Sequence, residues 1–334
     1  MTEIIGKLFG SRGLGEVISP VIPVSGGFMH KMYKVSAGGK LYAVKHLNSE
    51  IMKRPGVMEN YEKAEKLEKV LEKNSIPIVP ALIINNVKMQ EQDGEYFYIF
   101  NWQEGSITDW NAITIEQCRK AGNIQGKIHA IDYSDPESTK NTEVSENTEQ
   151  ESDIPDFKAL TLEAKAQDNE IYPLLAENES LLKYAVEQMV SARKKLPDIE
   201  TIIDDDMDPK NVMWYNDDPV VIDLECLDHG NPVSSVIQLS LQWAGVTTCS
   251  FDPEKMKAFF EGYHEAYDNG FRNYAEAFGL AYTWVEWLEY NIGRALGKCA
   301  DEDERCLGVS EVKNTVARIK YIRDIEESVK MLMR

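Results

Sequence analysis

Cysteine is scarce in this sequence, and its arrangement excludes the usual cysteine-based frameworks. Only five cysteines occur among 334 residues, and no two of them form a CxxC pair; they are Cys118, Cys226, Cys249, Cys299 and Cys306. An odd and scattered set is typical of free thiols in a reducing compartment. It argues against both a disulfide-stapled fold and a zinc site.

Long apolar runs are missing as well. The first ten residues lack the apolar core of a secretory signal peptide. No later segment has the roughly 20 consecutive apolar residues that a membrane-spanning helix needs. We therefore expect a soluble, cytoplasmic protein with no membrane partner.

Basic residues are outnumbered by acidic ones, with 36 Lys and Arg against 56 Asp and Glu, and the formal net charge is −20. Such a charge disfavours binding to nucleic acid and would attract a cationic small molecule, although many cytosolic proteins are acidic for solubility alone. The chain is long enough, and apolar enough at 43% hydrophobic residues, to form a large core in two lobes or domains.

The most informative stretch is Ile202–Glu225. It contains two apolar, β-branched runs, Val212–Tyr215 and Val220–Ile222, on either side of the turn-rich tetrad Asn216–Pro219. This pattern predicts a short β-hairpin.

Three oxygen-bearing side chains flank this hairpin. Asp206 and Asn211 precede its first strand, and Asp223 follows its second. A hairpin returns the chain on itself, so we expect these side chains to converge. Asp206 would orient a hydroxyl and accept its proton, while Asn211 and Asp223 are hard oxygen ligands suited to Mg²⁺, as phosphoryl transfer requires.

Two other interpretations of this loop were considered. Aspartate-rich loops are often solvated turns, but the two strands and the second aspartate favour a site. A calcium loop starting at Asp204 is excluded, because Pro209 stands where that loop needs glycine and Tyr215 where it needs glutamate.

The segment resembles the catalytic loop and metal-binding strand of the aminoglycoside phosphotransferase and choline kinase group, which shares the protein-kinase fold. The matching residues are Asp206-Met207-Asp208-Pro209-Lys210-Asn211-Val212 and Ile222-Asp223-Leu224-Glu225. Asp204-Asp205 and Ser234-Ser235 depart from that pattern. The resemblance implies a small-molecule kinase with ATP or GTP and Mg²⁺ as cofactors.

The N-terminal third fits the same resemblance. Ser25, Gly26 and Gly27 form a glycine turn that would let backbone amides approach phosphates. Lys45 ends a strand similar to the Val-Ala-Ile-Lys strand of kinases, where the lysine binds nucleotide phosphates. Such a lysine needs a carboxylate from the next helix, predicted over Val57–Lys73. Glu59, Glu62, Glu65, Glu68 and Glu72 compete for this role, and we choose Glu65.

The nucleobase would lie against the segment that follows the fifth expected strand, Glu95–Phe100. Ile99 and Phe100 would line its pocket, and the backbone around Asn101 and Gln103 would hold the base edge, as in the family hinge. Pro77–Ile83 resembles the family's entry into the fourth strand.

The rest of the chain reads as mainly helical from Thr114, with an exposed, mobile insertion at 134–156 that is poor in apolar residues. His129 is expected to be structural. The resemblance thus implies an α+β, two-lobe, protein-kinase-like fold. Residues 1–103 would form an N-lobe of antiparallel sheet plus one helix, and residues 104–334 a helical C-lobe.

The expected acceptor is a hydroxylated, cationic compound, aminoglycoside-like or an amino alcohol. Carboxylates and aromatics could bind its ammonium groups; we assign Asp208, Glu225, Glu286 and Trp287 to this role. A catalytically silent nucleotide-binding sensor or scaffold is the alternative. A protein kinase ranks third, because no Ala-Pro-Glu segment follows Asp223.

Overall fold

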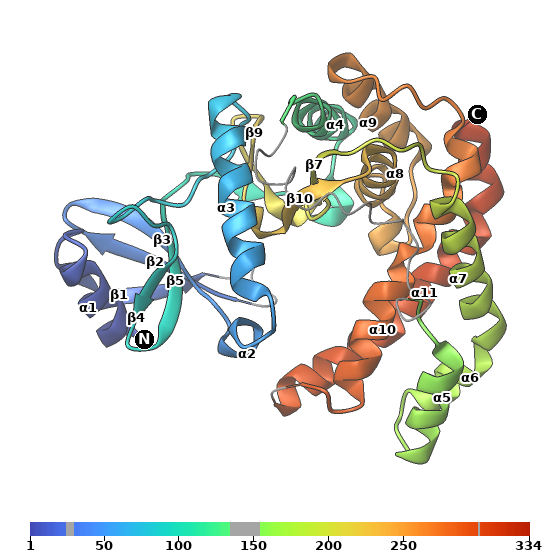
Figure 1. Cartoon of the computed structure of the whole chain (residues 1–334), viewed down its shortest axis with the longest axis horizontal. Coiled ribbons are helices and arrows are strands. Elements are labelled where there is room, and N and C mark those ends of the chain that lie inside the picture. The colour runs from blue at the N-terminus through green and yellow to red at the C-terminus, as the bar shows by residue number, and fades with distance from the viewer. Residues whose placement is uncertain (25–29, 134–153, 300) are drawn as a thin grey trace. The chain divides into compact units, whose positions relative to one another are not determined.

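The computed structural model describes residues 1–24, 30–133, 154–299 and 301–334. They form two compact units, drawn in Figure 1. The first unit comprises Met1–Asp109 and Asp206–Asp228, and the second comprises Trp110–Asp205 and His229–Arg334. The segment with the expected catalytic residues, Asp206–Asp228, therefore packs with the N-terminal part of the chain. The predicted division after residue 103 assigned this segment to the C-lobe.

A five-stranded antiparallel sheet forms the body of the first unit, in the order β1-β2-β3-β5-β4. Its strands are β1 (Val17–Val24), β2 (Lys31–Ala37), β3 (Lys40–His46), β4 (Gln90–Gln92) and β5 (Glu95–Asn101). Pro77–Ile83, expected as the entry into the fourth strand, makes only isolated bridges among the described residues, and β4 follows it later in the chain. Pro77 and Pro80 have no N–H to donate to a ladder, which accounts for the isolated bridges found in that segment.

Helices cover both faces of this sheet. On one face α1 (Thr2–Ser11) packs Ile5, Leu8 and Phe9 against the sheet, in a cluster that includes Val44 and Ile99. On the other face Tyr61 of α3 (Val57–Lys73) joins a cluster with Leu47, Ala81 and Tyr98. A short helix, α2 (Ser49–Met52), connects β3 to α3. The helix expected over residues 57–73 is present as α3, and it begins and ends at the predicted residues.

The expected hairpin is also present in the first unit. Strands β8 (Val212–Tyr215) and β9 (Asp218–Val221) pair antiparallel, and β6 (Ser106–Ile107) pairs with β8. The turn residues Asn216 and Asp217 have φ of 49° and 65°, the left-handed conformation that a two-residue hairpin turn needs. Pro219 lies in β9, an edge strand, where a missing N–H is tolerated. The 3₁₀ turns η4 (Pro209–Asn211) and η5 (Leu224–Cys226) flank the hairpin, and β10 (Leu227–Gly230) leads onward.

The second unit is mainly helical. Its longer helices are α4 (Ile115–His129), α5 (Phe157–Ala166), α6 (Tyr172–Glu177), α7 (Glu179–Arg193), α8 (Pro232–Trp243), α9 (Pro253–Ala266), α10 (Trp284–Ala295) and α11 (Glu302–Leu332). Strand β7 (Thr201–Asp204) and the 3₁₀ segments η1 (Trp110–Ala112), η6 (Val246–Thr248) and η7 (Tyr274–Thr283) complete it. A sheet-rich unit and a helical unit confirm the α+β class.

Glycines allow α4 and α9 to approach closely. A Cβ on Gly122 would collide with the carbonyl oxygen of Phe259, and one on Gly262 would collide with that of Arg119. His129 of the same helix is buried, and its Nδ1 lies 2.9 Å from the hydroxyl of Tyr263. Burial lowers the pKa of His129 to about 3.

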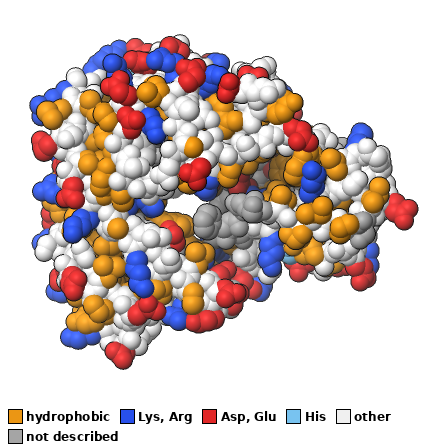
Figure 2. Space-filling view, turned by 180° about the vertical axis from the view of Figure 1, so that it is seen from behind, with side chains coloured by type: hydrophobic (Ala, Val, Ile, Leu, Met, Phe, Trp, Pro, Cys, Tyr) orange, Lys and Arg blue, Asp and Glu red, His pale blue; other side chains and the backbone are white. Residues whose placement is uncertain are grey.

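Within the described ranges, no helix combines the length and apolarity needed to cross a bilayer. On the face shown in Figure 2, Lys and Arg side chains are interspersed with Asp and Glu instead of forming one basic patch. The expected insertion at 134–156 lies outside the described residues except for its last three, where Asp156 caps α5 by accepting a hydrogen bond from Ala159 N.

Candidate active site

Lys45 lies on the α3 face of the sheet. In the antiparallel register it stands opposite Tyr98, and residues opposite each other point to the same face. Its side chain is only 6% exposed. A cavity of about 30 Å³ beside it is lined by Lys45, Tyr61, Ala64, Glu65, Glu68, Ala81, Tyr98, Phe100, Asp223, Leu224 and Glu225.

Two carboxylates from beyond the hairpin hold the Lys45 ammonium. Its Nζ lies 2.7 Å from Asp223 Oδ1 and 2.7 Å from Glu225 Oε1. Burial alone would lower the pKa of Lys45, but the attraction of Asp223 and Glu225 outweighs it, so the pKa is raised. Lys45 is therefore a fixed cation that residues far away in sequence hold in place.

Asp206 lies in the loop before η4 and is held by two donors. Lys210 Nζ donates to its Oδ1 at 2.6 Å, and Asn211 Nδ2 donates to its Oδ2 at 2.9 Å. Burial raises the pKa of Asp206, and the attraction of Lys210 opposes the rise. The carboxylate is thus oriented within its own loop and retains lone pairs for a substrate hydroxyl.

The hairpin register brings Asn211 and Asp223 to the same end. Ile222 N donates to Asn211 O at 2.9 Å. Asp223, the next residue along the chain, is therefore close to Asn211. Asp223 adopts φ 63° and ψ 62°, a left-handed conformation that is unusual for a residue other than glycine. Its charge also acts on Asp206. The convergence expected for these three residues is present.

A divalent cation fits this end of the hairpin by charge and ligand type. Among the described residues, four carboxylates (Asp206, Asp208, Asp223 and Glu225) pair with two lysines, Lys45 and Lys210, and with His30, which leaves an excess of acidic groups. Since Asn211 Nδ2 donates to Asp206, its Oδ1 is the atom able to bind a metal. The described residues hold no cluster of three or more acidic, Cys or His side chains suited to a metal. The remaining ligands would have to be phosphate oxygens and water, as is usual for Mg²⁺.

Two of the expected nucleotide residues differ from their assigned roles: Glu65 lines the cavity beside Lys45 without pairing with it, and Ile99 lies on the other face of the sheet. Glu65 accepts hydrogen bonds from the Tyr98 hydroxyl at 2.9 Å and from Met89 N at 3.3 Å, so the Lys45–Glu65 pair is not formed. Ile99 lies in the core on the α1 face, because it alternates with Tyr98 along β5. Phe100, by contrast, lines the cavity beside Lys45.

The expected hinge follows β5 directly. Asn101 is exposed and ends the strand, and Gln103 donates from Nε2 to Glu104 O at 3.1 Å. The glycine turn at Ser25, Gly26 and Gly27 lies outside the described residues. The nucleotide-binding roles given to these five residues remain predictions.

The residues assigned to the substrate have other contacts in the structure. Asp208 caps η4, with one oxygen accepting from Lys210 N and the other from Lys210 Nζ, and burial raises its pKa to about 6. Glu225 binds Lys45, as described above. In the second unit Glu286 pairs with Arg193 at 2.7 Å, and Trp287 Nε1 donates to Glu311 at 3.2 Å. Their substrate role remains a prediction.

Two residues of the site were not identified from the sequence. Lys210 forms ion pairs with both Asp206 and Asp208. All three lie within five consecutive residues, and this proximity in sequence is a signal that could have indicated the ion pairs. His30 places Nε2 3.2 Å from Glu225 Oε2, although the two lie far apart in the chain. No sequence signal indicates that contact.

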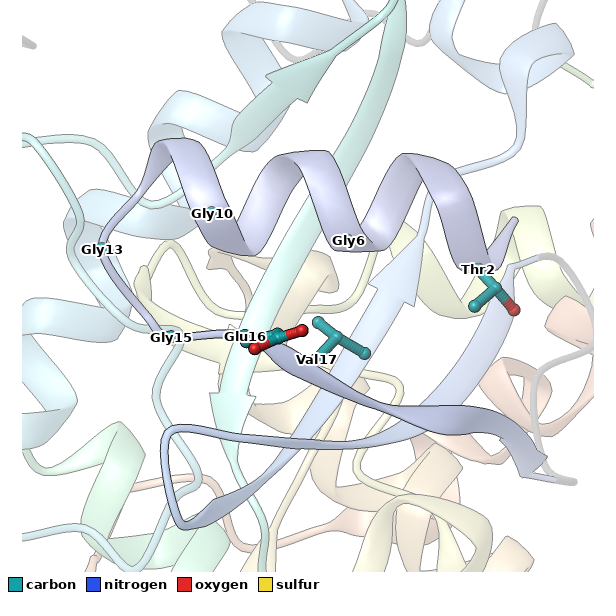
Figure 3. Close-up of a pocket in the computed structure, with 7 residues that line it drawn as sticks. All are labelled: Thr2, Gly6, Gly10, Gly13, Gly15, Glu16 and Val17. Carbon is teal, nitrogen blue, oxygen red and sulfur yellow. The ribbon is translucent and has the colours of Figure 1, made fainter.

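A larger hollow lies elsewhere in the first unit. Figure 3 shows Thr2, Gly6 and Gly10 along one side of α1, with Gly13, Gly15, Glu16 and Val17 leading into β1. Its volume is about 560 Å³, but of the described residues that line it Glu16 alone has an ionisable side chain. The chemistry-bearing residues gather instead around the smaller cavity at Lys45.

Comparison with known proteins identifies the family of the chain. Residues 20–276 match the model of the phosphotransferase enzyme family. A comparison with curated protein sequences finds no match.

Several solved structures share the fold over nearly the whole chain. One is a spectinomycin phosphotransferase in complex with ADP and spectinomycin, with TM-score 0.70, 14% identity, and 96% of this chain and 98% of that chain covered. A microcompartment-associated aminopropanol kinase gives TM-score 0.65 and 13% identity, covering 100% and 99%. An ethanolamine kinase of Plasmodium vivax gives 0.60 and 13%, covering 89% and 81%. These likenesses confirm the kinase-like fold.

Proposed function

Because the chain belongs to the phosphotransferase enzyme family, we propose that it moves the γ-phosphoryl group of ATP or GTP, with Mg²⁺, to a hydroxyl of a small cationic compound. The observation that carries this proposal is the loop-and-hairpin geometry. Asp206 is oriented by Lys210 and Asn211, and Asp223 stands at the same end of the hairpin with its charge acting on Asp206.

The proposed reaction is a direct in-line transfer. The acceptor hydroxyl oxygen forms a bond to the γ-phosphorus while the bond to the bridging oxygen breaks, and the nucleoside diphosphate leaves. Asp206 orients the hydroxyl and receives its proton. Lys45 binds phosphate oxygens. Mg²⁺, held by Asn211 and Asp223, would neutralise charge on the phosphates.

Two observations support a cationic acceptor. The chain has a formal net charge of −20, and an acidic protein attracts cationic ligands. The named relatives of similar fold include kinases of aminopropanol and ethanolamine, which are amino alcohols. We propose an acceptor that is aminoglycoside-like or an amino alcohol.

The proposed location is the cytoplasm, because free cysteines such as Cys118 and Cys226 are typical of a reducing compartment.

The first test is a thermal-shift screen of ATP and GTP, each with and without Mg²⁺. A panel of amino alcohols and aminoglycosides then follows, assayed for phosphate transfer from the nucleotide that binds. The proposal expects Mg²⁺-dependent nucleotide binding and transfer to at least one acceptor. Nucleotide binding with no transfer to any acceptor, nor to water, would instead support the silent sensor or scaffold.

The second test targets Asp206. Asp206→Asn should lower the transfer rate by about a thousandfold while leaving nucleotide binding in place, because general-base residues act on the chemical step. Asp218→Asn is the matched control, since Asp218 is an exposed aspartate of the same hairpin. Full activity of the Asp206 variant would remove this residue from the mechanism.

A further inference from the structure

Glu225 joins two basic side chains in the interior of the first unit. Its Oε1 lies 2.7 Å from Lys45 Nζ, and its Oε2 lies 3.2 Å from His30 Nε2. Its side chain is 19% exposed, against 34% for Asp223. Burial would raise the pKa of Glu225, but Lys45 and His30 outweigh it and hold the pKa below its usual range.

The helix that should supply a partner for Lys45 uses its inward carboxylates elsewhere. Glu65 accepts from the Tyr98 hydroxyl and from Met89 N. Glu68 lies 3.0 Å from the buried Lys88 ammonium and accepts from Ala81 N at 2.7 Å. Glu59, Glu62 and Glu72 are exposed on α3.

Asp223 cannot serve Lys45 alone if it also binds a metal. Its Oδ1 accepts from Lys45 at 2.7 Å. A cation drawn to the Asp223 carboxylate would weaken its hold on the lysine, because both compete for the same negative charge. A buried lysine that loses its counterions is costly, so a second carboxylate is needed.

We propose that Glu225 is the positioning residue that keeps Lys45 aimed at the nucleotide phosphates, in the role that the sequence assigns to Glu65. The proposal rests on the proposed function, since it requires that Lys45 bind phosphate. It also changes the part given to Glu225, from contacting the acceptor to holding a nucleotide ligand.

His30 fixes Glu225 in turn. Asn48 N donates to His30 Nδ1 at 3.0 Å, so Nδ1 acts as an acceptor and Nε2 is the ring nitrogen that faces Glu225. Nε2 lies 3.2 Å from Glu225 Oε2 and 3.5 Å from the Tyr61 hydroxyl. Each oxygen of Glu225 thus lies within ion-pair distance of one basic side chain, Oε1 near Lys45 and Oε2 near His30.

The experiment measures MgATP dissociation constants by isothermal titration calorimetry, with the Michaelis constant for ATP and kcat where an acceptor is known. Glu225→Gln keeps the shape and removes the charge. It should weaken MgATP binding by about tenfold and raise the Michaelis constant more than it lowers kcat. Glu65→Gln should change binding less than Glu225→Gln does. Glu3→Gln, at an exposed site on α1, controls for the loss of one charge.

A double-variant cycle separates positioning from folding. In a Lys45→Met background, Glu225→Gln should cause no further loss of MgATP affinity, because its effect runs through Lys45. Circular dichroism and thermal unfolding of each variant report whether the fold is kept. An equal loss in both backgrounds would overturn the proposal.

The outcomes separate the two proposals. If the natural chain binds neither MgATP nor MgGTP, the proposed function fails. If it binds MgATP, and Glu225→Gln binds as tightly while Glu65→Gln binds more weakly, then Glu225 is not the positioning residue and the proposed function stands. Wild-type affinity in both variants would overturn the role of Glu225 in the same way.

Discussion

Lys210 places its ammonium 2.6 Å from Asp206 Oδ1, four residues earlier in the same loop, and 2.8 Å from Asp208 Oδ2. The lysine is 30% exposed, so the pair lies at the edge of the protein interior. A cation in this position orients the proposed base and offsets the charge of two carboxylates. In the proposed reaction, this cation would also stabilise negative charge that develops near Asp206.

Lys210→Met should lower kcat by about tenfold to a hundredfold. It should also move the acid limb of the pH–rate profile to higher pH. Asp206 must be ionised to accept a proton, and activity therefore rises with pH through its pKa. Burial raises that pKa and Lys210 opposes the rise, so removing Lys210 leaves the pKa higher.

This prediction is measured as ADP formed from MgATP with the best acceptor, or as phosphate released where water is the acceptor, across pH 4 to 9. Lys53→Met is a suitable control, because Lys53 pairs with Glu50 on the surface and is 68% exposed. An unchanged acid limb in the Lys210 variant would show that the lysine has no influence on the ionisation of Asp206.

The parts of the site that depend on local pattern could be predicted from the sequence. The hairpin, its turn and the loop from Asp206 to Asn211 lie within one short segment, so strand propensity and turn chemistry were sufficient. The family and its enzyme class, a small-molecule kinase, were predicted from the same segment and are confirmed by the match over residues 20–276.

The parts that depend on distant contacts could not be predicted in this way. Ile99 and Phe100 were both expected in the nucleotide pocket. The strand register places Phe100 on the same face as Lys45 and Ile99 on the opposite face, and a register shift of one residue would exchange them. Lys45 pairs with Glu225, which lies 180 positions later in the chain, whereas the expected partner was Glu65 in the next helix. The pairing of η5 residues with the β3 strand is a property of tertiary packing, which propensity does not encode.

The close packing of α4 on α9 gives a test in the second unit. Gly122→Ala should destabilise the protein by about 2 kcal/mol, because the added methyl group collides with Phe259 O, a backbone atom that cannot turn aside. Gly6→Ala in α1 is the matched control, since a Cβ there meets nothing within 4 Å. It should stabilise by about 0.5 kcal/mol through helix propensity.

The measurement is the free energy of unfolding of each variant, obtained from urea-induced unfolding followed by circular dichroism. Equal stability of the two alanine variants would mean that α4 and α9 do not approach as closely as the structure indicates.

The last test concerns Glu326, a buried carboxylate of α11. Its oxygens accept from the hydroxyls of Tyr184 at 3.0 Å and Tyr282 at 2.7 Å, and it pairs with Arg323 and Lys330. Burial would raise its pKa, but these donors outweigh burial and lower the pKa to about 2. A carboxyl group whose pKa is lowered by folding stabilises the protein above its unfolded pKa, about 4.5, and loses that contribution as the pH falls toward 2.

Glu326→Gln should therefore lower the free energy of unfolding by about 2 kcal/mol at pH 7, and the difference from the natural chain should shrink between pH 4.5 and pH 2. Urea titrations at several pH values measure it, with Glu327→Gln as control because Glu327 is exposed on the same helix. The narrowing identifies the ionised form of Glu326 as the stabilising one, since a loss of packing alone would be the same at every pH. A constant difference across this range would contradict the assignment.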